Sequence, residues 1–238
     1  MSQTSRSSSN PLRLTLCAQP RSAKSRFAAR LPLRERAAYG IRSADMHPQG
    51  LIFDFDGTLA DTMPLHWHAW EIIAARHGFN LTRERLYSLG GVPSRDIIKM
   101  LAAEQGRTVD HLAIAKEKEL AFLVRLPEVK IIPEIVDVAH RHHEKLPMAV
   151  ATGGTHRVIE QLMEHLNLRH LFKAVVTSED VVNQKPAPDI FLEAARRIAV
   201  APKLCRAYED TDLGMQAIRA AGMEAVDVRD VLSGRLEA

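Results

Sequence analysis

The sequence lacks the features that mark membrane-spanning and disulfide-stabilised proteins. It has no apolar run of 18 or more residues, so we do not expect it to span or bind a membrane. Its two cysteines, Cys17 and Cys205, are far apart and do not have the C-x-x-C spacing of a thiolate metal site. A disulfide framework is therefore not expected either. We predict a cytoplasmic protein in a reducing compartment.

The sequence also lacks a net positive charge outside its first 45 residues. Residues 1–45 carry nine Lys and Arg against two acidic residues, whereas residues 46–238 have a net charge of −4. Nucleic-acid binding by this larger part is therefore not expected. The first 45 residues are rich in Ser, Arg and Ala without helical or strand periodicity, which predicts a disordered basic leader. Two alternatives stay open, an organellar transit peptide and a true start at Met46.

The stretch LIFDFDGTLADT, residues 51–62, carries the clearest chemical signal. Apolar residues frame Asp54 in what we expect to be a short buried strand, broken at Gly57. Residues i and i+2 of a strand point to the same side, so Asp54 and Asp56 should share one small space. Two close carboxylates repel, and Mg²⁺ is the oxygen-seeking cation that relieves this. A plain Asp-Gly turn is the alternative interpretation.

The periodicity of the chain predicts an α/β fold with a helical insertion. Between residues 63 and 128 only helical periodicity is present, over about 62–80, 82–88, 94–104 and 109–126. After Pro133 helices alternate with strands at 148–151, 174–177, 207–208 and 225–228. We therefore predict a Rossmann-like parallel-sheet core at 46–62 and 129–238, and a small all-helical domain at 63–128. Ligands of such folds bind at the carboxyl ends of the strands.

Two further polar sites lie at predicted strand ends. Thr152, Gly153 and Gly154 precede a helix predicted at 155–166, and a hydroxyl with two glycine amides at a helix N-terminus makes an anion site. An ordinary helix cap is the alternative. Lys185 lies on a loop stiffened by two prolines, where it could hold a phosphate or a carboxylate rather than serve as a solvated surface charge.

A last pair of acids follows the strand predicted around residue 208. Asp212 is expected to cap the next helix, which leaves Glu209 and Asp210 free to complete the metal site begun by Asp54 and Asp56. We therefore predict a Mg²⁺ site built from these four acids.

These motifs resemble, in order, the four motifs of the haloacid dehalogenase-like hydrolase superfamily of phosphatases and phosphomutases. DFDGTLADT resembles the nucleophile motif, and Thr152, Lys185 and the pair Glu209 and Asp210 match the other three. The position of the helical insertion resembles the helical-cap type. The stretches DTMPLHWHAW, LGGVPSRDI, KPAPDIF and EDTDLGMQAIRAAGM resemble the β-phosphoglucomutase-like branch, and within it the fructose-1-phosphate phosphatases.

The resemblance implies a Mg²⁺-dependent phosphatase that hydrolyses a small sugar phosphate through an aspartyl-phosphate. It implies that Asp54 is the nucleophile and that Asp56 is the general acid and base. The phosphoryl group would be bound by Thr152, Gly153 and Lys185. Mg²⁺ would be bound by Asp54, the Asp56 backbone carbonyl and Asp210, with Glu209 in support. Substrate contacts are expected from Thr58, His66 and Arg95.

A phosphosugar mutase of the β-phosphoglucomutase type uses the same motifs. Such mutases usually have valine at the position of Thr58, and an arginine for the distal phosphate where this chain has Ser94, which favours hydrolysis. Arg95 keeps the mutase open as the alternative, and a catalytically silent phosphate-binding protein is a third interpretation. We expect a monomer with a phosphorylated sugar as its partner, but the sequence does not identify the sugar.

Overall fold

The central element of the computed structural model is a parallel sheet in the order β3-β2-β1-β4-β5. The structure describes residues 47–236, so the predictions made for residues 1–45 lie outside it. The strands are β1 (Gly50–Phe53), β2 (Met148–Ala151), β3 (Ala174–Val176), β4 (Cys205–Glu209) and β5 (Glu224–Asp227). β1 lies in the middle, with Leu51 paired to Met148 of β2 and Gly50 to Cys205 of β4. The predicted parallel α/β fold is confirmed.

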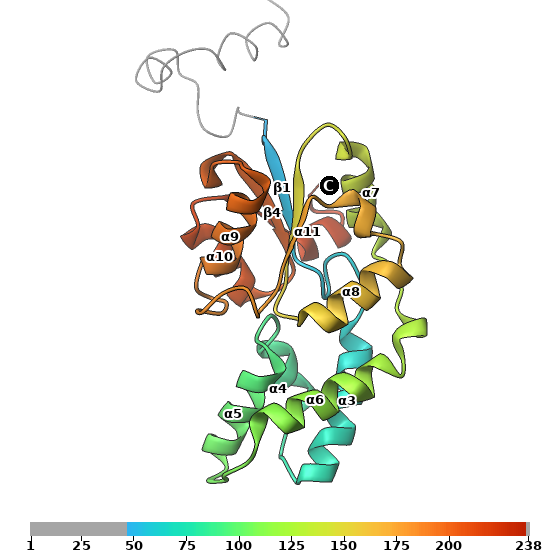
Figure 1. Ribbon diagram of the computed structural model, residues 1–238, viewed down its shortest axis with the longest axis vertical. Coiled ribbons are helices and arrows are strands. Elements are labelled where there is room, and N and C mark those ends of the chain that lie inside the picture. The colour runs from blue at the N-terminus through green and yellow to red at the C-terminus, as the bar shows by residue number, and fades with distance from the viewer. Residues whose placement is uncertain (1–46, 237–238) are drawn as a thin grey trace, which may run out of the picture. The chain divides into compact units, whose positions relative to one another are not determined.

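Helices cover both faces of this sheet (Figure 1). One face packs against α7 (Pro133–His142), α8 (His156–His165) and α11 (Val228–Leu232), and the other against α9 (Asp189–Ile198) and α10 (Asp212–Ala220). Alternation along β1 explains this, because Leu51 and Phe53 enter the first hydrophobic cluster and Ile52 enters the second. Short 3₁₀ helices lie at η3 (Leu126–Glu128), η4 (Arg169–Leu171) and η5 (Pro202–Leu204).

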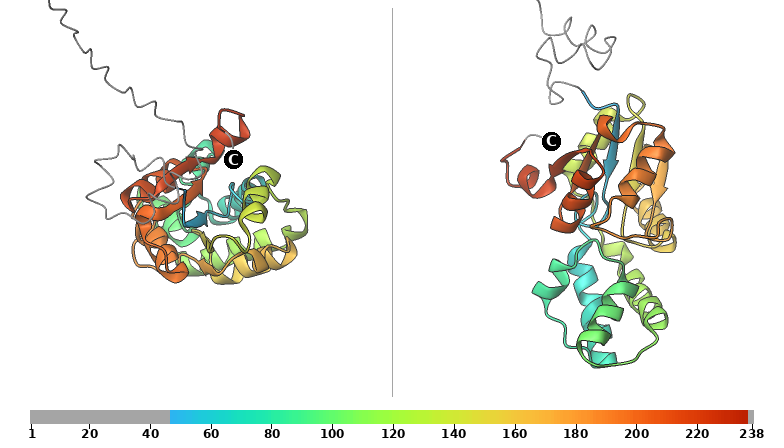
Figure 2. Two further views of the ribbon diagram at one scale, coloured as in Figure 1. Left: turned by 90° about the horizontal axis from the view of Figure 1, so that it is seen from above. Right: turned by 90° about the vertical axis from the view of Figure 1, so that its left-hand side faces the viewer.

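Four helices follow β1 and pack around a separate hydrophobic cluster (Figure 2). They are α3 (Met63–His77), α4 (Arg83–Ser88), α5 (Ser94–Glu104) and α6 (His111–Leu123). We call them the helical insertion. Local signals set their ends: Gly78 takes a left-handed φ of 67° after α3, and the Asp110 side chain accepts backbone N–H bonds that open α6. The division into domains at residues 63 and 128 stays a prediction.

The sequence predicts Ser94 and Asp212 as the N-caps of α5 and α10, and both predictions are wrong. Pro93 precedes α5, so Ser94 is the first helical residue and its hydroxyl caps nothing. Thr211, not Asp212, caps α10 through its hydroxyl oxygen, whereas the Asp212 side chain is 80% exposed. The short helix α11 was not predicted, because five residues are too few to show a helical period.

Among residues 47–236, no helix combines the length and the apolar character that crossing a membrane requires.

A chain that begins at Met46 should fold and turn over substrate like the full chain. Among the described residues, the first backbone contacts are the bond from Gln49 N to Leu204 O, at 2.8 Å, and the pairing of β1. We expect equal melting temperatures and equal kcat within error. A chain that begins at Phe53 loses most of β1 and should not fold, which makes it the control. A large fall in melting temperature for the Met46 chain would show that residues 1–45 contribute to stability.

Candidate active site

A buried lysine joins the ends of β1 and β4. Lys185 Nζ donates to Asp54 Oδ1 and to Glu209 Oε2, both at 2.7 Å, and its side chain is only 1% exposed. Asp54 directly follows β1, and Glu209 is the last residue of β4. Thr211 holds the second oxygen of Glu209 through its backbone N–H, at 3.0 Å, and its hydroxyl, at 2.7 Å. Asp54 and Lys185 therefore meet at the carboxyl edge of the sheet, where Lys185 binds carboxylates.

The carboxylates of Asp54, Glu209 and Asp210 form a group that fits a metal ion. One oxygen from each lies within 4.8 Å of the others, and hard oxygen donors of this kind suit Mg²⁺. Thr58 Oγ1 donates to Asp210 Oδ1 at 3.0 Å, so this hydroxyl is directed to Asp210 rather than to the substrate space. Gly57 has a φ of 81°, and a Cβ there would collide with the Asp210 carboxylate. The Asp56 side chain is not part of this group.

Negative charge exceeds positive charge in this group. Burial, and then the charge of Glu209, raise the pKa of Asp54 well above its usual range and that of Asp210 to about 7. Burial alone would lower the pKa of Lys185, but Asp54 and Glu209 raise it overall, so the lysine stays protonated. One ammonium cannot balance three buried carboxylates, and a divalent cation would supply the missing charge.

Asp56 belongs to a second hydrogen-bonded chain. Its Oδ1 accepts from Thr62 Oγ1 at 2.6 Å and lies 3.1 Å from His66 Nε2. The other ring nitrogen of His66, Nδ1, lies 2.7 Å from Lys118 Nζ. A lysine ammonium can only donate, so Nδ1 accepts and the neutral ring carries its proton on Nε2, which donates to Asp56. We call Thr62, Asp56, His66 and Lys118 the relay.

Burial sets the protonation states along the relay. Burial lowers the pKa of Lys118 to about 8, and its ammonium lies over the rings of Trp70 and Phe122, at 5.7 and 5.5 Å from their centres. Burial, and then the charge of Lys118, lower the pKa of His66. Burial would raise the pKa of Asp56, but His66, Thr62 and Lys118 together outweigh it and bring this pKa to about 2. Asp56 is therefore an ionised acceptor at neutral pH.

The predicted anion site lies on the other side of Asp54. Thr152 is buried, and its Oγ1 accepts from Gly154 N at 3.1 Å, which leaves the hydroxyl proton available to a phosphoryl oxygen. Gly153 faces Gly91 in the loop between α4 and α5, and a Cβ on Gly153 would collide with the Gly91 backbone carbonyl. Residue 153 must therefore be glycine for the helical insertion and the sheet edge to make this contact.

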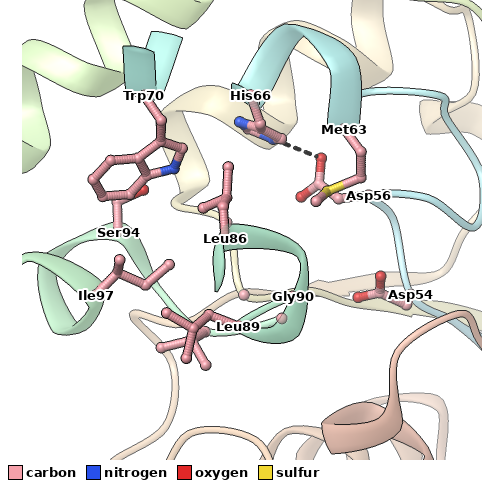
Figure 3. A pocket seen from close by; sticks show the side chains of 14 residues that line it. Asp54, Asp56, Met63, His66, Trp70, Leu86, Leu89, Gly90, Ser94 and Ile97 are labelled. Atoms are coloured by element: carbon pink, nitrogen blue, oxygen red, sulfur yellow. Dashed lines mark hydrogen bonds and ion pairs between the residues drawn. The ribbon is translucent and has the colours of Figure 1, made fainter. Parts of the chain in front are cut away.

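A chamber of about 80 Å³ joins these parts (Figure 3). Asp54 and Asp56 both line it, as do Gly153 and Gly154 from the sheet edge. The helical insertion contributes mostly hydrocarbon, and the chamber has no Lys or Arg among the described residues that line it. The wall residues of the insertion are Met63, His66, Trp70, Leu86, Leu89, Gly90, Gly91, Val92, Ser94 and Ile97.

A second opening of about 320 Å³ also reaches Asp56 and His66. Arg95 lines this opening, and its guanidinium donates to the Ser178 backbone carbonyl at 3.2 Å and to the Ser178 hydroxyl at 3.4 Å. Ser178 belongs to the loop after β3. Of the three predicted substrate contacts, His66 lines both spaces, Arg95 lines only the opening, and Thr58 lines neither.

Sequence reasoning missed Thr62 and Lys118. The run KEKEL around Lys118 has the composition of a solvated helix face, yet this lysine is only 5% exposed. A signal was present: Lys118 lies four residues from both Ile114 and Phe122, on the buried stripe of α6.

Comparison with known proteins places the chain in a family. The model of the haloacid dehalogenase-like hydrolase family matches residues 51–228, and the chain belongs to this family. Its relatives include the fructose-1-phosphate phosphatase YqaB of Escherichia coli (strain K12), 43% identical over 181 residues, which are 76% of this chain and 96% of that protein. The family and the class of enzyme that the sequence predicted, a hydrolase of the phosphatase type, are confirmed.

Mutases also occur among the similar proteins. The β-phosphoglucomutase of Bacillus subtilis (strain 168) is 28% identical over 189 residues, 76% of this chain and 83% of that protein. A solved structure of a putative β-phosphoglucomutase from Bacteroides vulgatus has a TM-score of 0.69 at 29% identity, over 84% of this chain and 85% of that one. The chain is therefore similar both to a sugar phosphatase and to β-phosphoglucomutases.

Lys118→Met should lower activity without lowering stability. The variant keeps the side-chain volume between Trp70 and Phe122 but removes the charge that fixes His66, so we expect kcat to fall at least about 10-fold, part of what acid–base catalysis contributes. The wild type should lose activity above about pH 8, as Lys118 loses its proton, and the variant should not show that loss. Because burial disfavours the ammonium at neutral pH, the melting temperature should not fall.

The exposed Lys99, on α5, offers the control. Lys99→Met should leave both kcat and its pH profile unchanged. Equal kcat values and pH profiles for wild type and Lys118→Met would show that the relay does not act in catalysis.

Proposed function

We propose that this protein is a Mg²⁺-dependent phosphatase that hydrolyses a small sugar monophosphate through an aspartyl-phosphate on Asp54. The observation that carries the proposal is that Asp54 and Asp56 line one chamber but have different partners, because Lys185 holds Asp54 whereas Thr62 and His66 hold Asp56. Such a pair suits one carboxylate to nucleophilic attack and the other to proton transfer. Fructose 1-phosphate is the first substrate to test, because the relative with 43% identity is named for it.

In the first half of the reaction Asp54 attacks phosphorus and the sugar departs. A carboxylate oxygen of Asp54 forms a bond to phosphorus as the bond from phosphorus to the ester oxygen breaks. Asp56 gives its proton to the departing oxygen. Without substrate Asp56 is ionised, but the negative charge of a bound phosphoryl group raises its pKa, which is the direction an acid needs. Thr152, Gly153 and Lys185 hold the phosphoryl oxygens.

In the second half water cleaves the aspartyl-phosphate. Asp56, again a carboxylate, takes a proton from the water. The oxygen of this water forms a bond to phosphorus as the bond between phosphorus and Asp54 breaks. Inorganic phosphate leaves and Asp54 is restored. His66 holds the Asp56 side chain in place for both proton transfers through a hydrogen bond of 3.1 Å. Lys118 in turn holds the ring of His66, at 2.7 Å.

The residues that would hold Mg²⁺ are Asp54, Glu209 and Asp210, with the Asp56 backbone carbonyl as a further ligand. When bound, the ion supplies positive charge that reduces the repulsion between the phosphoryl oxygens and the carboxylate nucleophile. Thr58 and Thr211 orient two of these acids, since each donates a hydroxyl hydrogen bond to one of them.

The residues that line the chamber favour hydrolysis over transfer of the phosphoryl group back to the sugar. A mutase must bind a second phosphate of a bisphosphate, and the described residues that line the chamber offer no Lys or Arg for it. The cations that line the adjoining opening are Arg95, Lys116 and Arg157. Arg95, the candidate for that task, is bonded to Ser178. The mutase remains the alternative because a β-phosphoglucomutase is among the relatives. A monomeric state and a cytoplasmic location also stay predictions.

Asp210→Asn should raise the Mg²⁺ requirement by about 10-fold or more, with a much smaller effect on KM for the sugar phosphate. The wild type should need more Mg²⁺ below about pH 7, because the proton on Asp210 competes with the ion, and this dependence should flatten in the variant. Titration of Mg²⁺ between pH 6 and 8 measures both effects. Asp212→Asn changes an exposed acid two residues away and is the control. An unchanged titration would place the metal elsewhere.

The products formed from β-glucose 1-phosphate distinguish a phosphatase from a mutase. A phosphatase should release inorganic phosphate and form no glucose 6-phosphate. Arg95→Ala should then weaken binding of a monophosphate only modestly, whereas in a mutase it should cost about 2 to 5 kcal/mol, the loss expected when a buried phosphate loses its cation. Glucose 6-phosphate forming faster than free phosphate, together with a collapse of activity in Arg95→Ala, would establish the mutase instead.

A further inference from the structure

The indole of Trp70 presents an unused hydrogen-bond donor to the chamber. Trp70 is on α3, is 2% exposed and lines the chamber. Its Nε1 has no acceptor among residues 47–236, since its polar neighbour Lys118 lies over the face of the ring. Figure 3 shows the indole nitrogen on the edge of the ring that faces Leu86. The N–H thus lies at the wall of the chamber without a hydrogen bond to any described residue.

An indole N–H usually has a hydrogen-bond partner. That of Trp70 is not among the fully enclosed polar atoms of the described residues that lack one, so it can bind what occupies the chamber. No described residue of the neighbouring walls accepts a hydrogen bond from it. Leu86, Leu89 and Ile97 present hydrocarbon to the same space. The acceptor must therefore come from what fills the chamber. Ser94 adds a second polar group there, since its hydroxyl does not cap α5.

The leaving group is the part of the substrate that reaches this donor. Asp54 and Lys185 hold the phosphoryl group at the sheet edge, and Asp56 protonates the ester oxygen. Asp56 and His66 line the chamber together with the wall of the insertion that contains Trp70. The carbon skeleton bound to the ester oxygen therefore lies between Asp56 and Trp70.

We propose, on the basis of the proposed function, that Trp70 is a specificity-determining residue whose N–H binds a hydroxyl or carbonyl oxygen of the sugar. A site with a fixed donor discriminates against ligands that lack the acceptor, because the donor is then buried without a partner. The hydrocarbon around it is unfavourable for a second phosphate. The chamber is thus selective for uncharged, oxygen-bearing leaving groups over oxygen-poor ones such as phenol.

Trp70→Phe tests this by removing the N–H and keeping an aromatic ring. The measured quantity is the ratio of kcat/KM for fructose 1-phosphate to kcat/KM for phenyl phosphate, with Mg²⁺. This ratio should fall about 5- to 50-fold, the range expected when a buried acceptor loses its donor. Trp67→Phe is the matched control, because Trp67 is on the same helix, packs in the same cluster and does not line the chamber. An unchanged ratio in Trp70→Phe, or an equal fall in Trp67→Phe, would overturn the proposal.

A binding measurement covers the case in which Trp70→Phe does not fold. The chain has two tryptophans, so the ¹⁵N-labelled protein gives two indole N–H resonances, which Trp67→Phe assigns. In Asp54→Asn, which lacks the nucleophile, fructose 1-phosphate with Mg²⁺ should shift the Trp70 resonance downfield and leave that of Trp67 in place. Inorganic phosphate with Mg²⁺ should shift neither. Failure of the sugar phosphate to move the Trp70 resonance, although it binds, would show that water alone occupies this donor.

The two proposals fail differently. If the wild type releases no phosphate from any sugar phosphate, the proposed function fails. If it does so and the ratio and the Trp70 resonance both stay unchanged, only the role of Trp70 fails.

Discussion

The excess of negative charge at the carboxyl ends of β1 and β4 is the constraint on which the rest of the site depends. Asp54, Asp56, Glu209 and Asp210 are brought together by two neighbouring strands, and the fold balances them in two separate ways. Lys185 partly neutralises Asp54 and Glu209, whereas the relay withdraws Asp56 from the group and holds it ionised. Two acids only two residues apart thereby acquire different chemistry, because their partners differ.

The sheet and the helical insertion contribute different chemistry to the chamber. The sheet edge provides the carboxylates, the lysine and the backbone amides that act on a phosphate ester. The insertion provides hydrocarbon walls and one buried cation, Lys118, which acts through His66 rather than on the substrate. Changes in the insertion can therefore alter which leaving group fits without disturbing the groups that carry out phosphoryl transfer, with the exception of the relay.

The sequence was sufficient to predict those parts of the site that follow from strand periodicity. Buried strands with acids at their ends place Asp54 and Asp210 at one edge of a parallel sheet, whatever the details of packing. The errors arose where a side chain had two local options. Thr211 and Asp212 can both cap a helix, and only the proximity of Glu209 shows why the hydroxyl is used.

Lys118 shows a different limit of sequence analysis. A lysine among charged residues is usually solvated, and its burial depends on α6 packing against α3, a contact between segments about 50 residues apart. The same holds for Arg95, since no local pattern predicts that its partner is Ser178 in a loop 83 residues further along the chain. Long-range pairings of this kind are determined by tertiary packing and leave no local pattern in the sequence.

The contact between Gly153 and the Gly91 carbonyl sets a narrow tolerance for closing the chamber. A single methyl group at position 153 would collide with the Gly91 carbonyl and push the α4–α5 loop away from the sheet edge. The same small gap would admit bulk water beside Asp54. A single methyl group could therefore change how well the chamber excludes solvent while leaving every acid that lines it in place.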